Sequence, residues 1–535
     1  MTYFDYFPAG YTPNSQQEFI LEELDKARLA DKRFIVINAP VGSGKSHIAK
    51  TLANSVKEPS ENFKEFVRSG AIFDIRDPED AEGMPRSGTA ILTMSKTLQN
   101  QYYNTFSDGV VLKGKSNYEC LNSDNLSCEL GPCNFKMGFK RCDDCLYYLQ
   151  RSKAAMAQCS FYSYAMFMSL PLGCRLKKVL VCDEASELED ILVKSYSVEF
   201  NFKILKKLGV NLTPAPPVDS EYEKYLLWFR TTKNSIDDEL IFIREKLSQN
   251  KKKKSKEDQI KFRALLFLRD HCDRLMYGMD KTEFIVEHNK DGIEFKPLYV
   301  NALAQDMFAF CDLVVFMSAT IIDHRNFTKQ LGIKEEDYYY IEAESTFDPK
   351  KAPIKLSNQI SVTYANKNIT IPKLAKIAKA ICTHHKGQKG IIHTHNMEIT
   401  SALQNECGRD KRFLFREKGM YNEQMLDIHT STTDDTILVS PSMTHGVSLD
   451  GELGEFSIIM KAPFLPLGDK RIRRLAEMDK DWYEDKMIST FVQMCGRTIR
   501  SQTDTSITYV LDGSLTKRII ENADKLPKYI LDRIA

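Results

Sequence analysis

The sequence has few features that would send the chain into a membrane or out of the cell. Residues 1–6 show neither the basic start nor the apolar core of a signal peptide. No apolar run approaches the ~18 residues that a membrane-spanning helix needs. We therefore expect a protein of the reducing, intracellular (cytoplasmic) compartment.

An excess of charge of either sign is also missing, since the formal net charge is +1. This balance neither indicates nor excludes a nucleic-acid partner, because acidic surface elsewhere can offset a basic groove. The 535 residues are 42% hydrophobic and 27% charged, as in ordinary globular proteins. The length favours roughly three or four domains, each with its own core.

Disulfides are not expected either, although the chain has 13 cysteines. Without an export signal, clustered cysteines indicate a metal site rather than disulfides. Six of them fall within forty residues, namely Cys120, Cys128, Cys133, Cys142, Cys145 and Cys159.

Short apolar runs bounded by polar or turn residues predict buried strands, and helical patterns lie between them. This alternation favours parallel α/β sheets. Two interruptions break it: about 110–165 holds the cysteines, and about 195–300 is charged, poor in Gly and predicted to be mostly helical. The predicted strands are 34–37, 90–93, 179–182, 313–317, 390–393, 437–439, 456–460 and 507–511.

The first predicted strand leads into a phosphate-binding loop of the pattern [AG]-x4-G-K-[ST]. Its glycines let backbone N–H groups turn toward a polyphosphate, and the following helix presents its positive end. Lys45 can reach the β- and γ-phosphates, and the Ser46 hydroxyl can bind Mg²⁺. The loop predicts a site for a nucleoside triphosphate, made by Ala39, Pro40, Val41, Gly42, Ser43, Gly44, Lys45 and Ser46.

Two further motifs supply hydrolytic groups. Asp183 and Glu184 end another strand, where adjacent carboxylates are costly unless they face a cation or a reactive water. We expect Asp183 to hold Mg²⁺ and Glu184 to position the attacking water. Near the end of the chain, Gln493, Arg497 and Arg500 fall in a Gln-x-x-Gly-Arg-x-x-Arg run, whose arginines can offset charge on a γ-phosphate.

In this order, with Ser318-Ala319-Thr320 between them, the motifs resemble those of superfamily 2 helicases, and the layout resembles the DinG/XPD family of iron–sulfur DNA helicases. The resemblance covers nearly the whole chain. It makes Gln17 the adenine-reading residue, with Gln16 as the alternative register. It also assigns strand contact to residues 93–99, the opening strand of a second motor domain to 390–394, and a fifth motif to 442–451.

The chain departs from the family pattern at several positions. Ser186 stands where the family has a His that couples the motor domains, and His445 and Ser448 replace two acids of the fifth motif. Ser514 stands where an arginine is usual. The Mg²⁺, water and arginine groups remain, so these departures bear on coupling rather than on hydrolysis.

The resemblance also assigns the cysteine cluster to one four-iron, four-sulfur centre. Residues 113–120 and 145–148 match the edges of the family's cluster-binding insertion. The favoured ligands are Cys120, Cys128, Cys133 and Cys145, with Cys142 as the rival. Spacing alone leaves zinc open, because Cys142-x2-Cys145 also suits a zinc site, and Cys159 is expected to be a buried thiol.

The resemblance implies an α/β fold with two RecA-like parallel-sheet motor domains, and an iron–sulfur lobe and a helical arch inserted in the first. Motor domain 1 is predicted in three parts, 1–110, 161–195 and 301–345. The lobe would be 111–160, the arch 196–300, and motor domain 2 346–535.

The predicted function is an ATP- and Mg²⁺-dependent DNA helicase that moves on single-stranded DNA and acts at duplex junctions. The 5′-to-3′ direction is implied by the resemblance only. RNA and RNA–DNA hybrids stay open as substrates, and we expect a monomer. The alternative is a nucleic-acid-stimulated ATPase translocase that remodels protein–DNA complexes without processive unwinding.

Some basic and histidine-rich stretches have two readings. The lysine run 251–254 and the run 470–474 suit either solvated surface or phosphate contact. The lobe residues Lys113, Lys115, Lys136, Lys140 and Arg141 would suit strand contact. Four histidines resemble a metal site by number but are expected to be structural or surface groups: His384, His385, His393 and His395.

Overall fold

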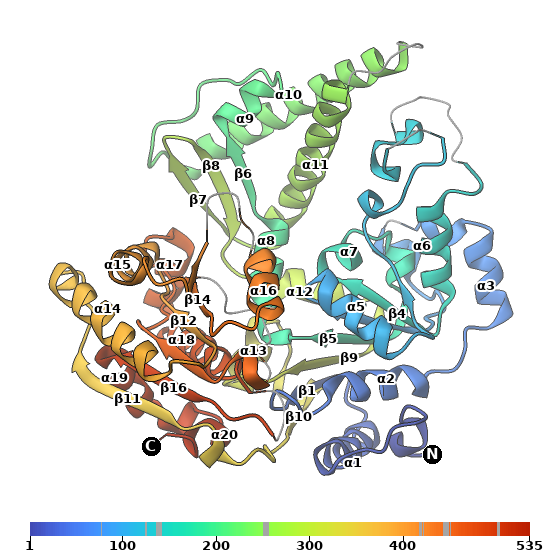
Figure 1. The fold of residues 1–535 in the computed structure, drawn as a ribbon. Coiled ribbons are helices and arrows are strands. Elements are labelled where there is room, and N and C mark those ends of the chain that lie inside the picture. Colours follow the sequence, from blue (N-terminus) through green and yellow to red (C-terminus); the bar gives the residue numbers. More distant parts are fainter. Residues whose placement is uncertain are drawn as a thin grey trace.

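Two parallel sheets and one small antiparallel sheet organise the chain in the computed structural model (Figure 1). The structure describes residues 1–75, 77–122, 126–134, 142–249, 256–416, 420, 422–441, 449, 451–499 and 503–534. Within these ranges, every helix is too short or too polar to cross a bilayer. The α/β class with two RecA-like domains, expected from the sequence, is confirmed.

The first sheet has seven strands in the order β10-β1-β9-β5-β2-β4-β3, all parallel. Successive residues of its central strands point to opposite faces, so that Val36 joins one apolar cluster while Ile35 and Ile37 join another. Helices cover both faces, as a parallel sheet requires. The strands are β1 (Phe34–Asn38), β2 (Thr89–Thr93), β3 (Val110–Val111), β4 (Cys159–Ser163), β5 (Lys177–Asp183), β9 (Cys311–Ser318) and β10 (Tyr338–Glu342).

The second sheet has six parallel strands in the order β11-β16-β15-β12-β14-β13. It stands beside the first sheet, and the carboxyl-terminal helices lie between or behind the two (Figure 1). The strands are β11 (Ile354–Ile360), β12 (Gly390–His393), β13 (Phe413–Phe415), β14 (Ile437–Ser440), β15 (Phe456–Ile459) and β16 (Ile507–Asp512).

The helices of the two motor domains follow the strands in the alternation predicted from the sequence. The first domain has α1 (Ser15–Leu29), α2 (Lys45–Ser55), α3 (Glu61–Arg68), α4 (Pro78–Ala81), α5 (Lys96–Thr105), α6 (Leu146–Met156), α7 (Tyr164–Met168), α8 (Leu188–Tyr196), α12 (Asn301–Phe308) and α13 (His324–Gln330). The second has α14 (Lys367–His384), α15 (Met397–Cys407), α16 (Asn422–Ser431), α17 (Lys470–Met478), α18 (Lys480–Cys495), α19 (Gly513–Glu521) and α20 (Lys528–Leu531).

The segment expected to be a mostly helical arch contains a sheet as well. Two long helices, α10 (Tyr222–Gln249) and α11 (Lys256–Met279), rise from the body with α9 (Phe202–Lys207) (Figure 1). At their base lies an antiparallel sheet of order β6-β8-β7. Its inward side chains are apolar while Glu199 and Glu294 alternate with them. These strands are β6 (Val198–Asn201), β7 (Phe284–Asn289) and β8 (Gly292–Pro297).

The cysteine-rich segment forms a small lobe of turns beside the first sheet. It consists of the short 3-10 turns η3 (Lys115–Asn117), η4 (Cys128–Leu130) and η5 (Pro132–Asn134), followed by α6. Cys159 lies on β4, inside the motor sheet, and is 3% exposed, which confirms the buried thiol predicted for it. The lobe meets the arch where the Arg263 guanidinium pairs with Glu129 at 3.0 Å.

Candidate nucleotide-binding cleft

The phosphate loop joins β1 to α2 in the strand–loop–helix order that its sequence predicts. Gly42 and Gly44 have φ of +82° and +77°, a left-handed backbone that favours glycine. A Cβ at Gly44 would lie 2.1 Å from Gln17 Nε2, so a larger residue there would displace the Gln17 amide as well as strain the backbone. The buried Ser43 hydroxyl has no hydrogen-bond partner among the described residues, and a phosphate oxygen bound in the loop would supply one.

Lys45 lies over the loop that it follows. Its ammonium donates to the carbonyls of Ala39 at 2.9 Å and Pro40 at 3.1 Å. The Ser46 side chain, in the first turn of α2, is half-buried. The loop, its lysine and its serine are therefore assembled at the amino-terminal end of α2, where anions are favoured.

The two glutamines at the entry motif have different surroundings. Gln17 is buried, caps α1 together with Asn14, and donates from Nε2 to the Gly44 carbonyl at 3.2 Å. Gln16 instead lines the cleft and donates to the Glu344 carbonyl at 2.5 Å. Gln17 thus supports the loop, whereas the alternative residue, Gln16, is the one that borders the space for a ligand.

Asp183 and Glu184 stand where β5 ends, next to the loop. The Asp183 carboxylate accepts from the Tyr102 hydroxyl at 3.0 Å and from the Glu184 N–H at 3.0 Å. Burial and the neighbouring Glu184 charge raise the pKa of Asp183 to about 6, against the opposing effect of Lys45. Glu184 has φ of +52° and lines the cleft. A buried carboxylate with a raised pKa, next to a half-buried second carboxylate, fits a Mg²⁺ site, because a bound cation would favour the charged form of Asp183.

A chain of hydroxyl and amide groups crosses between the two motor domains. Ser186 Oγ lies 3.0 Å from Ser318 Oγ and accepts from Thr320 Oγ1 at 2.9 Å. Gln493, on α18 of the second domain, donates from Nε2 to Thr320 at 3.2 Å and to Glu187 at 2.8 Å. Ser186, which replaces the family's histidine, is therefore connected to Gln493 through Thr320.

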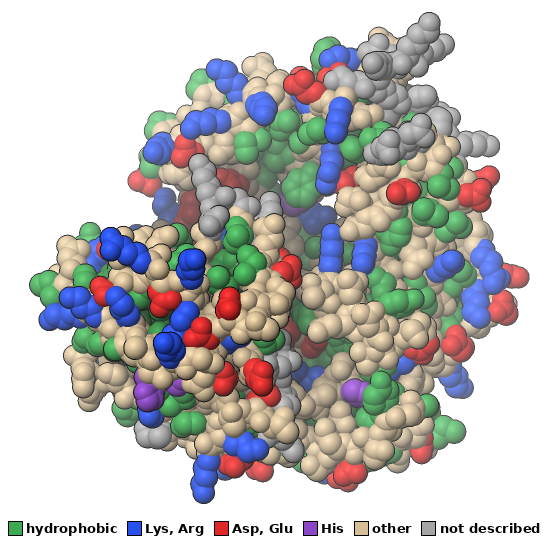
Figure 2. All heavy atoms as spheres, in the orientation of Figure 1, with side chains coloured by type: hydrophobic (Ala, Val, Ile, Leu, Met, Phe, Trp, Pro, Cys, Tyr) green, Lys and Arg blue, Asp and Glu red, His purple; other side chains and the backbone are tan. Residues whose placement is uncertain are grey.

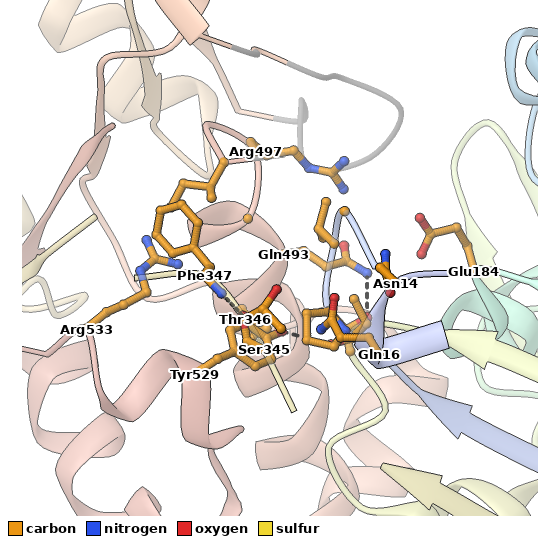
Figure 3. A pocket seen from close by; sticks show the side chains of 18 of the residues that line it. Asn14, Gln16, Glu184, Ser345, Thr346, Phe347, Gln493, Arg497, Tyr529 and Arg533 are labelled. Carbon is orange, nitrogen blue, oxygen red and sulfur yellow. Dashed lines mark hydrogen bonds between the residues drawn. The ribbon is translucent and has the colours of Figure 1, made fainter. Parts of the chain in front are cut away.

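Arg497 follows α18 and reaches the same cleft, where Figure 3 shows it on the upper side, with Glu184 across from it. Beside it, burial and the Arg497 charge lower the pKa of His393 to about 3, so that this histidine stays neutral. Arg500 lies outside the described residues, as do residues 442–448 with His445 and Ser448.

The cleft has about 1070 Å³ of empty volume and draws its lining from both domains. Its left and lower sides in Figure 3, and Asn14 on the right, are made by residues that the sequence analysis did not find. Most of them come from the segment that links the domains and from the carboxyl-terminal end of the chain, far from any motif, whereas Asn14 stands just before the entry glutamines. Tyr529 also donates to the Ala319 carbonyl at 3.0 Å. These residues are Asn14, Ser345, Thr346, Phe347, Tyr529 and Arg533.

The cysteine lobe brings thiols together without forming a recognisable metal group. Cys128 and Cys145 are buried, with their Sγ atoms 3.8 Å apart. Burial first, and then the nearby thiols of Cys145 and Cys120, raise the pKa of Cys128 to about 11. Within the described ranges, no group of three or more His, Cys, Asp or Glu could hold a metal ion. Lys136, Lys140 and Arg141 lie outside those ranges.

The remaining sequence features are mostly structural. Gln99, in the segment expected to contact the strand, is buried and donates to the carbonyls of Leu112 and Phe161. Lys96 from the same segment donates to Asn117 of the lobe at 3.0 Å. His385 and His395 make ordinary hydrogen bonds, which confirms their structural reading. Residues 251–254 lie outside the described ranges.

The basic run 470–474 is partly buried: Arg471 is neither solvated nor free for a phosphate, whereas Arg473 and Arg474 are exposed. Arg471 on α17 is buried, donates to Glu189 Oε1 of α8 at 2.7 Å and to the Pro297 carbonyl at 2.8 Å. Lys486 pairs with the other Glu189 oxygen at 2.9 Å. The run thus holds the second motor domain against the first and against the base of the arch.

Comparisons with known proteins agree with this architecture. The DEAD_2 family model matches residues 129–205, and the model of a helicase C-terminal domain matches residues 392–531. A comparison with curated protein sequences finds no significant match. Three similar solved structures are an XPD helicase (15% identity, TM-score 0.62, covering 94% of this chain and 97% of that one), an apo XPD (15%, 0.58, 96% and 98%) and Xpd4 of S. tokodaii (14%, 0.55, 97% and 99%).

The matched domains occur in the order that the motifs predict, and each falls on its own part of the fold. Their sequence signatures indicate a nucleic-acid helicase with an ATPase motor, and the fold is shared with XPD structures over nearly the whole chain. The two matched domains and the shared fold together support an XPD/DinG-like superfamily 2 helicase.

Proposed function

We propose that this protein is an ATP- and Mg²⁺-dependent DNA helicase that moves along single-stranded DNA in the 5′-to-3′ direction. The observation that carries the proposal is the cleft itself. The phosphate loop and Glu184 from the first domain, and Gln493 and Arg497 from the second, line one space. Hydrolysis there would change the contacts that join the two domains.

The residues of the cleft divide the chemistry between them. Lys45 would leave the Ala39 and Pro40 carbonyls for the β- and γ-phosphates, since its ammonium can be drawn away from neutral oxygens by anionic ones. Ser46 and Asp183 would hold Mg²⁺, which supplies charge neutralisation at the phosphates. Glu184 would orient the attacking water, and Arg497 with Arg500 would offset the charge that develops on the γ-phosphate.

The cross-domain chain gives a route by which hydrolysis can move the domains. Thr320 contacts both Ser186 beside the carboxylates and Gln493 on α18. A displacement of Ser186, two residues after Glu184, would therefore reach the second domain through two hydrogen bonds. This route supports a motor that remains coupled despite serine at position 186.

Strand separation tests the proposal directly. We would compare 5′-tailed and 3′-tailed DNA duplexes, and the matching RNA and RNA–DNA hybrid duplexes, with ATP and Mg²⁺. The expected result is unwinding of the 5′-tailed DNA only. The matched control is Lys45→Ala, which should abolish hydrolysis and unwinding together.

Three other results would change the conclusion. Strand-stimulated hydrolysis without unwinding of any duplex would favour a translocase that remodels protein–DNA complexes. Preferential unwinding of RNA duplexes would identify RNA rather than DNA as the substrate. ATP hydrolysis equal in the wild type and Lys45→Ala would contradict an ATPase at this cleft.

We further propose that the lobe holds a four-iron, four-sulfur cluster through Cys120, Cys128, Cys133 and Cys145, with Cys142 as the rival ligand. The donor set fits such a group, because these free thiols interact with one another in a lobe that has little core of its own. A bound cluster would supply cross-links among its turns.

Metal analysis of protein purified without air tests this assignment. About four irons per chain with visible absorption are expected. Cys128→Ser should lose both, whereas Cys159→Ser, a buried thiol on β4, should keep both. Zinc in place of iron would overturn the cluster.

A further inference from the structure

A second pocket lies where the arch joins the first motor domain, away from the nucleotide cleft. It has about 700 Å³ of empty volume and is lined from α7, α8, α11 and α12. Figure 1 shows these helices meeting at the lower end of α11. Two arginines face this pocket: Arg175, just before β5, and Arg274 on α11.

The structure places no carboxylate of its described residues in an ion pair with either guanidinium. Among the described residues, neither Arg175 nor Arg274 forms an ion pair or a side-chain hydrogen bond. The Nε atom of Arg175 is also buried without a partner. Burial lowers the pKa of Arg175, as expected for a desolvated cation without a carboxylate beside it. Leaving a buried charged donor unpaired costs more than leaving a neutral one, so the arrangement suits an anion.

The acidic groups nearby are already engaged by other cations. Asp273, which also lines the pocket, pairs with Lys233 at 3.1 Å. Asp306, close to Tyr277, pairs with Lys281 at 3.2 Å and accepts from the Tyr277 hydroxyl at 2.7 Å. The pocket therefore keeps the positive charge of its two arginines.

The exposed face of α11 leads into this pocket. Arg263 and Arg274 lie about three helical turns apart on one face, and Phe267 lies between them. Phe267 is 64% exposed, while Arg263 reaches the cysteine lobe. Figure 2 shows Lys and Arg side chains gathered around the hollow beside the arch. Alternating cationic and aromatic groups are typical of single-strand binding surfaces.

We infer that Arg175 and Arg274 form a phosphate-binding pocket that holds a backbone phosphate of the bound strand, with Phe267 as a stacking surface for a base nearby. The source of the phosphate rests on the proposed function, because a nucleic-acid motor brings a strand to this face. A free polyphosphate has the same chemistry and is the second source that an experiment must separate.

The test measures binding of a fluorescein-labelled 20-nucleotide oligo-dT without ATP, so that its outcome does not depend on motor activity. Arg274→Gln removes the cation on the helix and leaves the half-buried Arg175 in place. We expect Arg274→Gln to bind oligo-dT about fivefold to tenfold more weakly than the wild type. The slope of log K against log salt concentration should also be smaller in magnitude by about 0.7. Arg274→Lys should restore most of the slope. The matched control is Arg230→Gln, an exposed arginine on α10.

A second arm separates the two phosphate sources. Inorganic tripolyphosphate is titrated into the Lys45→Ala protein, whose nucleotide cleft is disabled, with and without Arg274→Gln. Loss of tripolyphosphate binding with unchanged oligo-dT binding would keep the pocket and assign it to a free polyphosphate. Unchanged binding of both ligands in Arg274→Gln, at an unchanged melting temperature, would overturn the inference. Equal weakening by Arg230→Gln would also overturn it, since the effect would then be one of net charge.

Discussion

At the scale of single residues, the surroundings of Asp183 in the cleft raise the pKa of its carboxyl group. Its folded pKa of about 6 lies above the ordinary value of 3.8, because burial and Glu184 disfavour the carboxylate. The folded chain then binds a proton that the unfolded chain releases between these two pH values. Stability from this group is full below pH 4 and is lost as the pH rises through 6.

Asp183→Asn should therefore stabilise the first motor domain at pH 8 by up to about 3 kcal/mol, and by little at pH 4. Thermal unfolding without Mg²⁺ or nucleotide at the two pH values measures the difference. Asp337→Asn, an exposed carboxylate, serves as the control. An equal gain at both pH values would mean that the carboxylate is not strained by burial. The same variant should lose Mg²⁺-dependent hydrolysis.

Thr320 gives a second residue-scale prediction. Thr320→Val keeps the shape but removes the hydroxyl that joins Ser186 to Gln493. Two hydrogen bonds of about 1 kcal/mol each are lost, so we expect strand stimulation of ATP hydrolysis to fall about tenfold or more. The measurement is kcat with and without oligonucleotide, beside Thr231→Val on α10 as control. Full stimulation in Thr320→Val would exclude this route of coupling.

The residues of the cleft also show what the sequence could and could not predict. The loop at 39–46 could be predicted from its glycine spacing, and Asp183 and Glu184 from their paired charge, because both groups directly follow apolar strands. Tyr529 and Arg533 have no such pattern, because their role arises only when the last helix packs beside Ala319 and Cys495. The sequence could not decide whether Gln16 or Gln17 borders the cleft, because the answer depends on which side of the first turn of α1 each residue occupies.

At the scale of elements, every strand predicted from an apolar run is present, within one or two residues of its bounds. Some missed strands have mixed composition, such as β11, whose central residues are exposed or half-buried, and others, β3 and β13, are apolar but only two or three residues long. The antiparallel sheet of the arch was missed for a similar reason. Its alternating Glu and Phe residues sit between long amphipathic helices, whose periodicity dominates the segment.

The contact of α8 with α17 and α18 depends on one buried carboxylate. Burial alone would raise the pKa of Glu189, but Lys486 and Arg471 outweigh it and lower the pKa to about 2. The group's stability is therefore full above about pH 4.5 and is lost as the pH falls toward 2. At neutral pH the network is complete.

Glu189→Gln should destabilise the chain by about 3 kcal/mol or more, because the buried Arg471 loses its carboxylate and Lys486 keeps only the more exposed Asp190. Its neighbour provides the control: Asp190 also pairs with Lys486 but is 53% exposed, so Asp190→Asn should cost less than about 1 kcal/mol. Chemical denaturation at pH 7 measures both variants. Similar small losses would show that the domain contact does not depend on Glu189.

At the scale of the whole molecule, the cleft makes the two motor domains share one ligand. Glu184 and Arg497 come from different sheets, and Tyr529 joins the last helix to Ala319. A ligand that contacts both domains stabilises the folded form of each, and by linkage it favours one relative arrangement of them. The fold predicted from the sequence contained both domains, but their contact surface could not be derived from motifs alone.

This sharing predicts how nucleotide affects unfolding of the full chain. A non-hydrolysable ATP analogue with Mg²⁺, at about 100 times its Kd, should stabilise the chain by about 2.7 kcal/mol. Differential scanning calorimetry should show the transitions of both motor domains moving to higher temperature together. In Lys45→Ala neither should move. A shift confined to the first domain's transition would mean that Arg497 and its neighbours do not hold the nucleotide, and that the cleft is completed only when a strand is bound.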